Sequence, residues 1–242
     1  MSLNVLDRGS NLEYRFVPEG PTVSQLEWQA ILAAIEATEG KWLIASGSIP
    51  NGIPQDAYAQ IARIAARHGR RFVLDTSGPA LRAALGQGIE LAKPSLGELE
   101  HLVGRVLPDR RDQEDEAMAL VRSGAARMVA VTLGADGAFL ATPEGVLRRA
   151  AMDVAVHSAV GAGDAFLAGM TLALARGDSP AEALAWGTAA GAAAIVCAGT
   201  ARLRRADVEA RYRELCSAPP PQPRSARQIE PVTEAVAGGD DG

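Results

Sequence analysis

The stretch Val160-Gly161-Ala162-Gly163-Asp164-Ala165-Phe166 places two glycines before an aspartate and leads into the apolar residues 167–175, which predict a helix. Such a helix start suits an anion, because the first N–H groups lack partners, the helix dipole is positive there, and glycine lets a phosphate approach the backbone. Asp164 would repel that phosphate. Its carboxylate instead suits removal of a proton from an attacking hydroxyl, or metal binding.

The same pattern has a structural alternative, a turn followed by an aspartate that caps a helix. Two commoner phosphate motifs are excluded. Phe166 stands where a dinucleotide fingerprint has its third glycine, and no Gly-x4-Gly-Lys-Ser/Thr occurs in the chain. The rest of the sequence must therefore decide between an anion site and a simple cap.

Composition favours one α/β domain in the cytoplasm. The chain has 242 residues, 48% of them hydrophobic, which is enough for one core. A net charge of −5 argues against nucleic acid or an anionic membrane surface as a partner. Cys197 and Cys216 have no metal-ligand spacing with a histidine and are expected to be reduced thiols.

Two stretches were candidates for targeting or membrane segments, and neither fits. Asn4, Asp7 and Arg8 interrupt any apolar leader. Residues 183–201 carry no charge, but they are mostly alanine and glycine, so an interior helix is expected in place of a membrane span.

From Trp42 onward, short apolar runs alternate with amphipathic stretches, which predicts βαβ units and a parallel sheet. The turn composition of residues 142–145 predicts a hairpin and thus an antiparallel margin. The expected strands are residues 42–45, 72–74, 89–92, 128–133, 138–141 and 146–149. The expected helices are residues 55–68, 114–122, 163–176, 179–197 and 206–215, and an interruption of the fourth at Gly187 or Gly191 is left open.

Polar motifs end several of these predicted strands: Ser46-Gly47-Ser48, Asp75, Lys93 and Thr132-Leu133-Gly134. Because ligands of open α/β sheets bind outside the carboxyl ends of the strands, these motifs are expected on one rim. The alternative is ordinary loop chemistry, since glycine, serine and aspartate commonly follow strands.

Five stretches, in chain order, resemble the signatures of the ribokinase-like (PfkB-type) carbohydrate kinases. They are Ser46-Gly47-Ser48-Ile49-Pro50, residues 73–78, Lys93-Pro94-Ser95-Leu96-Gly97-Glu98, residues 131–138 and residues 160–166. With Tyr14-Arg15-Phe16-Val17, the resemblance is closest to the 6-phosphofructokinase branch, with tagatose-6-phosphate kinases and 1-phosphofructokinases as near neighbours. It implies a three-layer α/β/α sandwich with a mostly parallel central sheet.

The resemblance implies catalytic roles at the first motif. Asp164 would accept the proton of the sugar hydroxyl, while the backbone at Gly161, Ala162 and Gly163 would form an anion hole for the transferred phosphoryl group.

The resemblance also implies ligand contacts elsewhere. Glu98 would organise Mg²⁺ through water, although the family's Asn-x-x-Glu is here Ser95-x-x-Glu98, and serine has a shorter reach and no amide donor. Ser48 would face the sugar phosphate. ATP would be contacted by Lys93, Ser95, Thr132, Gly134, Gly137 and Ala192. A monovalent cation such as K⁺ would be ringed by Ser158, Val160, Ala194, Cys197 and Gly199, with a turn packed on a helix as the alternative.

The N-terminal part of the family pattern is not visible in this sequence. Residues 4–17 resemble only the last part of the lid and the strand that re-enters the sheet. The family's first strands, a glycine pair, an acidic residue that binds sugar hydroxyls and most of the lid have no counterpart. We therefore expect a truncated product, a fragment or a degenerate paralogue, with a kinase domain over residues 1–216 and a disordered, proline-rich tail over residues 217–242.

Two functional hypotheses follow. The first is transfer of phosphate from ATP to fructose 6-phosphate, giving the bisphosphate of glycolysis, or to tagatose 6-phosphate, fructose 1-phosphate or another sugar. The second is a nucleotide-binding remnant or fragment without transfer activity. Because strand 42–45 would lack its usual neighbours, we also expect a homodimer or a soluble aggregate.

Overall fold

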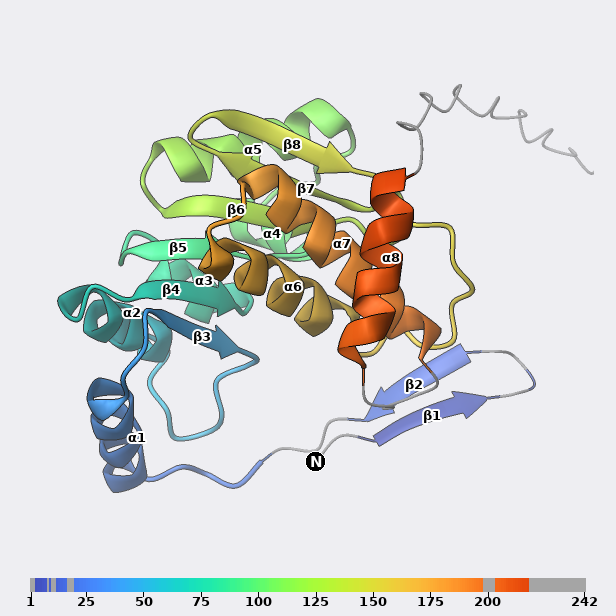
Figure 1. The fold of residues 1–242 in the computed structure, drawn as a ribbon. Coiled ribbons are helices and arrows are strands. Elements are labelled where there is room, and N and C mark those ends of the chain that lie inside the picture. The colour runs from blue at the N-terminus through green and yellow to red at the C-terminus, as the bar shows by residue number, and fades with distance from the viewer. Residues whose placement is uncertain (1–2, 8, 10–11, 17–19, 198–202, 218–242) are drawn as a thin grey trace, which may run out of the picture.

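The computed structural model describes residues 3–7, 9, 12–16, 20–197 and 203–217. A six-stranded sheet in the order β3-β4-β5-β6-β7-β8 forms the centre (Figure 1). Strands β3 to β6 are parallel, whereas β7 and β8 are antiparallel to their neighbours. The strands are β3 (Trp42–Ser46), β4 (Arg71–Asp75), β5 (Ile89–Ala92), β6 (Ala126–Thr132), β7 (Ala138–Thr142) and β8 (Gly145–Arg149).

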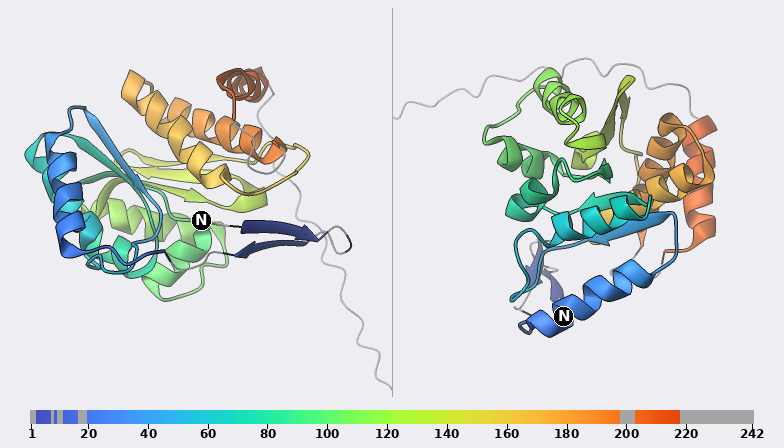
Figure 2. Two further views of the ribbon diagram at one scale, coloured as in Figure 1. Left: turned by 90° about the horizontal axis from the view of Figure 1, so that it is seen from below. Right: turned by 90° about the vertical axis from the view of Figure 1, so that its left-hand side faces the viewer.

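Helices cover both faces of the sheet, as Figure 2 shows from two further sides. On one face lie α6 (Ala162–Arg176) and α7 (Pro180–Val196), with α8 (Arg205–Ser217) packed outside α7. The other face carries α1 (Gln25–Ala37), α2 (Ala57–Arg67), α3 (Gly78–Ala84), α4 (Leu96–Val103) and α5 (Arg110–Arg122). The predicted three-layer sandwich is therefore confirmed.

Alternating side chains of each buried strand supply the two cores. In β4, Phe72 and Leu74 belong to the core beneath α1 to α5, and Val73 belongs to the core beneath α6 and α7. All three are fully buried. This is the pattern of a parallel strand covered on both faces, and it fixes the register of the sheet, because a slip of one residue would exchange the two cores.

Every predicted strand and the hairpin are confirmed within a few residues. Three helices, α1, α3 and α4, were not predicted. The open question about the fourth predicted helix is also answered: α7 runs without interruption from Pro180 to Val196. Its glycines face α6, so a Cβ atom on Gly187 would lie 2.5 Å from Met170 Cγ.

The N-terminal segment differs from its prediction. Strands β1 (Leu3–Asp7) and β2 (Leu12–Phe16) form a separate antiparallel pair, and among the described residues neither one enters the main sheet. The predicted re-entry of a strand is therefore wrong for these residues. At the other end α8 includes Ser217, and residues 218–242, the remainder of the predicted tail, lie outside the described residues. No helix in the described part of the chain is both long and apolar enough to cross a bilayer.

The close contact of α6 with α7 gives a stability prediction. A Cβ atom on Gly169 would lie 2.7 Å from the carbonyl oxygen of Trp186 and 2.9 Å from Ala190 Cβ. Alanine gains about 1 kcal/mol in helix propensity, but overpacking costs about 1–3 kcal/mol. We expect Gly169→Ala to lower the free energy of unfolding, measured in urea. The matched control is Gly97→Ala in α4, where a Cβ meets nothing within 4 Å. Equal effects of the two changes would contradict the packing argument.

Candidate active site

The polar motifs that end the parallel strands lie on one rim, as predicted. Ser46 and Asp75 are paired at the last register position of β3 and β4. Lys93 follows β5 directly, and an isolated bridge joins Ser95 to Thr132 at the end of β6. The carboxyl ends of four strands thus bring these residues together beside the start of α6.

The start of α6 has the geometry of an anion site. Gly161 caps the helix with φ +78°, a left-handed conformation that favours glycine. The first i→i−4 bond runs from the N–H of Ala165 to the carbonyl of Gly161, at 2.9 Å. The N–H groups of Gly163 and Asp164 precede that bond and have no intrahelical acceptor. The N–H of Ala162 donates to the carbonyl of Ala159 at 3.3 Å, which is a long bond.

Asp164 is exposed on the first turn of α6 and contacts the edge strand of the sheet. The hydroxyl of Ser46 donates to Asp164 Oδ1 at 3.1 Å. Sequence reasoning selected Ser48 of the same motif, which is also exposed. Strand alternation was the missed signal, because Ser46 lies two positions from Ile44 and four from Trp42, and Trp42 packs beneath α6 and α7.

A buried ion pair lies behind Asp164. Lys93 Nζ is 3.1 Å from Asp75 Oδ1, and the two side chains are 6% and 15% exposed. Burial raises the pKa of Asp75, the ammonium of Lys93 opposes that rise, and the carboxylates of Glu98 and Asp164 add to it. Lys93 was predicted to contact ATP. In the structure its ammonium neutralises the carboxylate of Asp75. The position of Asp75 on the rim was predicted, but its pairing with Lys93 was not.

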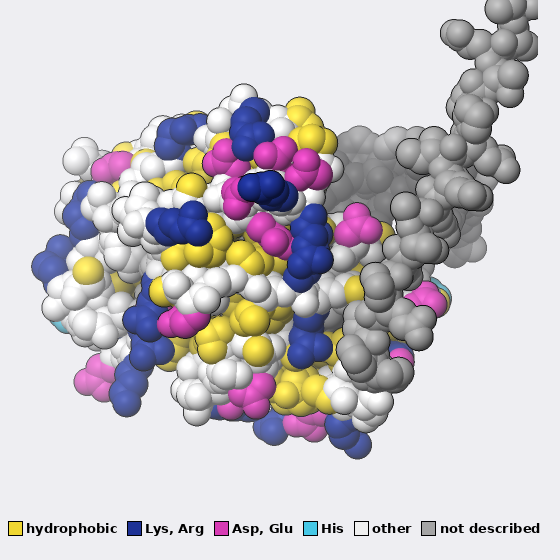
Figure 3. Space-filling view, turned by 90° about the horizontal axis from the view of Figure 1, so that it is seen from above, with side chains coloured by type: hydrophobic (Ala, Val, Ile, Leu, Met, Phe, Trp, Pro, Cys, Tyr) yellow, Lys and Arg dark blue, Asp and Glu magenta, His cyan; other side chains and the backbone are white. Residues whose placement is uncertain are grey.

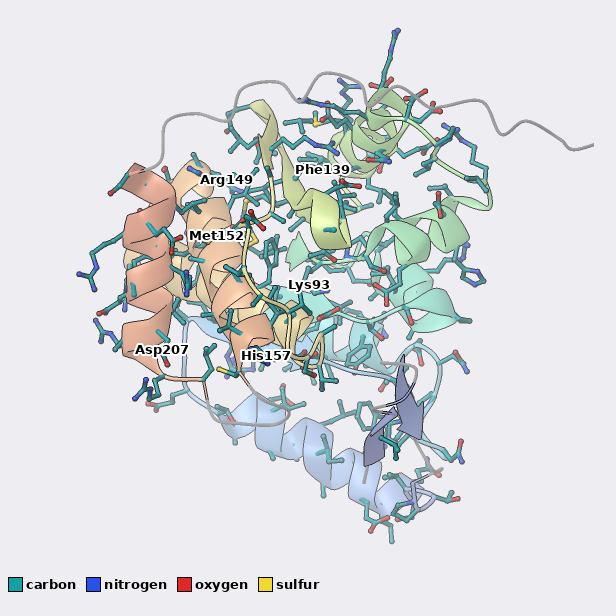
Figure 4. All side chains as sticks on the ribbon, turned by 90° about the vertical axis from the view of Figure 1, so that its right-hand side faces the viewer. Lys93, Phe139, Arg149, Met152, His157 and Asp207 are labelled. Atoms are coloured by element: carbon teal, nitrogen blue, oxygen red, sulfur yellow. The ribbon has the colours of Figure 1, made fainter. Side chains whose placement is uncertain are left out.

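Gly163 lies next to the buried ammonium. A Cβ atom on Gly163 would lie 3.5 Å from Lys93 Nζ, which is an ordinary van der Waals distance. The first turn of α6 thus lies close to Lys93, and an alanine would also fit at this position. Figure 4 shows Lys93 in the interior of the molecule, between the helix layers. The positive end of α6 and one lysine thus lie close to three carboxylates, those of Asp75, Glu98 and Asp164.

Ser95 and Glu98 form a capping box at the start of α4. The N–H of Glu98 donates to Ser95 Oγ at 3.3 Å, and the N–H of Ser95 donates to Glu98 Oε2 at 2.7 Å. Where the family has asparagine, this serine therefore caps the helix and orients the glutamate. Across the described residues, no three acidic, histidine or cysteine side chains converge as metal ligands. A Mg²⁺ ion held here by Glu98 would keep most of its waters, which is its usual preference.

Gly134, Gly137 and Ala192 were predicted to contact ATP, and the structure shows the local environment of each. A Cβ on Gly137 would collide with the carbonyl oxygen of Arg149, so the close approach of two backbones requires glycine. Ala192 is buried in α7. Gly134 begins a short 3-10 turn with φ +59°, and Leu133 separates it from the end of β6.

The residues predicted to ring a monovalent cation lie where the loop before α6 meets the end of α7. The N–H groups of His157 and Ser158 donate to the carbonyl of Ile195 at 2.8 and 3.3 Å. Ser158 Oγ accepts from the N–H of Val160, and the N–H of Cys197 donates to the carbonyl of Ala194. Ser158, Val160, Ala194 and Cys197 are thus brought together, whereas Gly199 lies outside the described residues.

A cavity of about 620 Å³ lies elsewhere, at the amino ends of the strands. Its lining includes Arg71, Glu90 and Arg127 and none of the rim residues named above. Open α/β sheets bind their ligands at the carboxyl ends of the strands. The rim lies at those ends and carries the carboxylate of Asp164 beside the start of α6. The rim is therefore the candidate active site.

A helix start with free N–H groups beside an exposed carboxylate, on the rim of a parallel sheet, is the arrangement expected of a phosphoryl-transfer site. Residues 3–206 match the model of the pfkB family carbohydrate kinases. The chain belongs to that family, as its motifs predicted.

Individual relatives agree with this assignment. The chain is 37% identical to the ATP-dependent 6-phosphofructokinase isozyme 2 of Mycobacterium tuberculosis over 220 residues, which are 90% of this chain and 64% of that protein. It is 35% identical to the 1-phosphofructokinase of Rhodobacter capsulatus, covering 76% of this chain and 57% of that one. The chain thus spans less than two thirds of either relative.

Among solved structures, phosphofructokinase-2 of Escherichia coli with potassium superposes with a TM-score of 0.84 at 36% identity, covering 89% of this chain and 70% of that one. Other structures of that protein contain fructose-6-phosphate or show a tetrameric inhibited form.

The buried ion pair gives a test with a pH signature. We expect Lys93→Met to lower the free energy of unfolding by about 3–5 kcal/mol at pH 8, because the charge of Asp75 is left buried and unpaired. Loss of Lys93 also removes the influence that lowers the pKa of Asp75, so that pKa rises further. The folded variant then binds a proton more tightly than the unfolded chain, and its stability falls as pH rises through the window between the ordinary and the raised pKa.

The cost of Lys93→Met should therefore be smaller at pH 5 than at pH 8 in urea denaturation. The control is Lys93→Met combined with Asp75→Asn, which should show little of this pH dependence. A cost of Lys93→Met that is the same at both pH values would show that Asp75 is not the group left unpaired.

Proposed function

We propose that this chain acts as an ATP-dependent sugar-phosphate kinase and that fructose 6-phosphate is its acceptor. The observation that carries the proposal is the placement of Asp164 on the first turn of α6, hydrogen-bonded to Ser46 and next to the N–H groups that precede the first helical bond. Support for the acceptor comes from the phosphofructokinase names of the relatives. The cytoplasm is the proposed location, which fits the free thiols of Cys197 and Cys216.

In the proposed reaction, the acceptor hydroxyl approaches Asp164, whose carboxylate takes the proton as the hydroxyl oxygen bonds to the γ-phosphorus. The bond from that phosphorus to the bridging oxygen breaks, and ADP leaves with the electron pair. The N–H groups of Gly163 and Asp164 donate to the phosphoryl oxygens, and the helix dipole supports the negative charge.

The remaining residues position the reactants. Glu98, oriented by its capping box with Ser95, would hold the waters of a Mg²⁺ ion that neutralises the ATP phosphates. Thr132 and Gly134 would line the nucleotide side and Ser48 the sugar-phosphate side. Potassium in a solved relative supports a K⁺ site at the junction of residues 157–160 with the end of α7, adjacent to the start of α6.

A second candidate function is nucleotide binding without transfer. It is favoured by Ser95, which stands where the family motif has asparagine and caps α4 by accepting from the N–H of Glu98. A site that holds ATP but misaligns it with the acceptor would not transfer phosphate.

Turnover separates these functions. With Mg-ATP, we expect ADP formation only when fructose 6-phosphate is added, measured by a coupled assay and by direct detection of the bisphosphate. Preference for ribose, adenosine or another unphosphorylated acceptor would contradict the proposed substrate class. Binding of ATP in calorimetry without sugar-dependent turnover would favour the second function.

Asp164 can be tested separately from nucleotide binding. We expect Asp164→Asn to lower kcat by at least about 10²-fold and leave the affinity for ATP nearly unchanged, because a general base acts in the transition state. Ser46→Ala, which removes only the donor to Asp164, is the matched variant and should reduce kcat less. Retention of more than a tenth of the activity in Asp164→Asn would exclude this residue as the base.

A further inference from the structure

The turn that follows β3 is held by three hydrogen bonds at Gly47. Its N–H donates to the carbonyl of Asp75 at 2.9 Å, one residue beyond the pairing of Ser46 with Asp75. Its carbonyl accepts from the hydroxyl of Thr76 at 2.8 Å and from the hydroxyl of Tyr58 at 2.9 Å. A carbonyl oxygen has two lone pairs, so both are used here. The backbone at Gly47 is therefore fully bonded.

Tyr58 is the donor that comes from outside the sheet. It lies in the first turn of α2, and its ring packs against the core beneath α1 to α5. Burial raises the pKa of Tyr58, and the carboxylate of Asp75 adds to that rise. The hydroxyl therefore keeps its proton and remains a donor, which ties the turn after β3 to α2.

Gly47 lies between the two serines of its motif. On one side, the hydroxyl of Ser46 donates to Asp164 Oδ1 at 3.1 Å. On the other side, Ser48 is exposed and is the residue assigned to the sugar phosphate in the proposed function. Gly47 has φ +112°, a region that glycine enters easily and also leaves easily. Bonds from outside the turn are thus needed to hold both serines in one arrangement.

We infer that Tyr58 is a positioning residue for the acceptor side of the site: by holding Gly47, it keeps Ser46 against Asp164 and keeps Ser48 in a fixed place on the rim. Its effect on turnover rests on the proposed function. Thr132 and Gly134, on the proposed nucleotide side, follow a different strand, β6. Tyr58 should therefore influence the acceptor and not ATP.

Tyr58→Phe tests this role, because it keeps the packed ring and removes only the hydroxyl. We expect kcat to fall about 3-fold and KM for fructose 6-phosphate to rise about 3-fold, together the effect of about one hydrogen bond, with KM for ATP nearly unchanged. A mere loss of folded protein would lower kcat and move neither KM. The matched control is Tyr212→Phe, whose ring stacks on Trp186 in the α7–α8 contact and which should change none of these values.

A double-mutant cycle tests whether Tyr58 acts through Ser46. In a Ser46→Ala background the donor to Asp164 is already lost, so Tyr58→Phe should lower kcat by less than about 1.5-fold further. Its effect on KM for fructose 6-phosphate should persist, because Ser48 is still present. An undiminished effect on kcat in the Ser46→Ala background would show that Tyr58 does not act through Ser46 and would overturn the inference.

Calorimetry with fructose 6-phosphate gives a comparison that needs no turnover. We expect Tyr58→Phe to raise the dissociation constant of the sugar phosphate about 3-fold and to leave that of ATP nearly unchanged. Figure 3 shows basic side chains interspersed with acidic ones on one face of the molecule, and a phosphate ester can bind weakly to such surfaces. Binding of that kind does not involve the Tyr58 hydroxyl, so it cancels between the variant and the unchanged protein.

The two measurements separate this inference from the proposed function. Binding of fructose 6-phosphate without turnover would contradict the kinase function, while a weaker binding confined to Tyr58→Phe would still support the positioning role. Equal changes for the sugar phosphate and ATP, the same changes in Tyr212→Phe, or an unchanged protein that neither binds nor converts a sugar phosphate would overturn the positioning role.

Discussion

The geometry of the site depends on how closely α6 can approach α7 and the sheet. Gly169 and Gly187 remove the side chains that would separate the two helices. A helix held this closely cannot shift along its axis without breaking contacts in a densely packed core. The position of Asp164 relative to Ser46 is thus set by glycines that lie more than one helical turn from Asp164.

This packing brings opposite charges together at low solvent exposure. Burial raises the pKa of Asp75, the carboxylates of Glu98 and Asp164 add to that rise, and Lys93 opposes it from within the protein. In the proposed reaction, an incoming phosphate would add further negative charge to the same rim. The N-terminal N–H groups of α6 and a magnesium ion would balance it, which is a physical reason for a helix start and an acidic rim to stand together.

The sequence predicted the layers, the parallel strands with their antiparallel margin, and the rim, because apolar runs and strand-ending motifs are local signals. It did not predict α3 or α4, which have 7 and 8 residues and show too little periodicity. For α1 a signal was present, since Ser24 and Glu27 form a capping box, but only Trp28 in that helix is buried. The contact of Ser46 with Asp164 spans 118 positions, so local patterns could not reveal it. The capping role of Ser95 could have been read from its spacing to Glu98.

The strand that contributes Ser46 carries a constraint that β8 does not. A proline or a charge within β3 would disturb the strand end from which Ser46 donates to Asp164. Strand β8 stands at the other end of the strand order from β3, so its arginines cannot disturb that contact. The difference in sequence between these two strands therefore follows from the place where α6 meets the sheet.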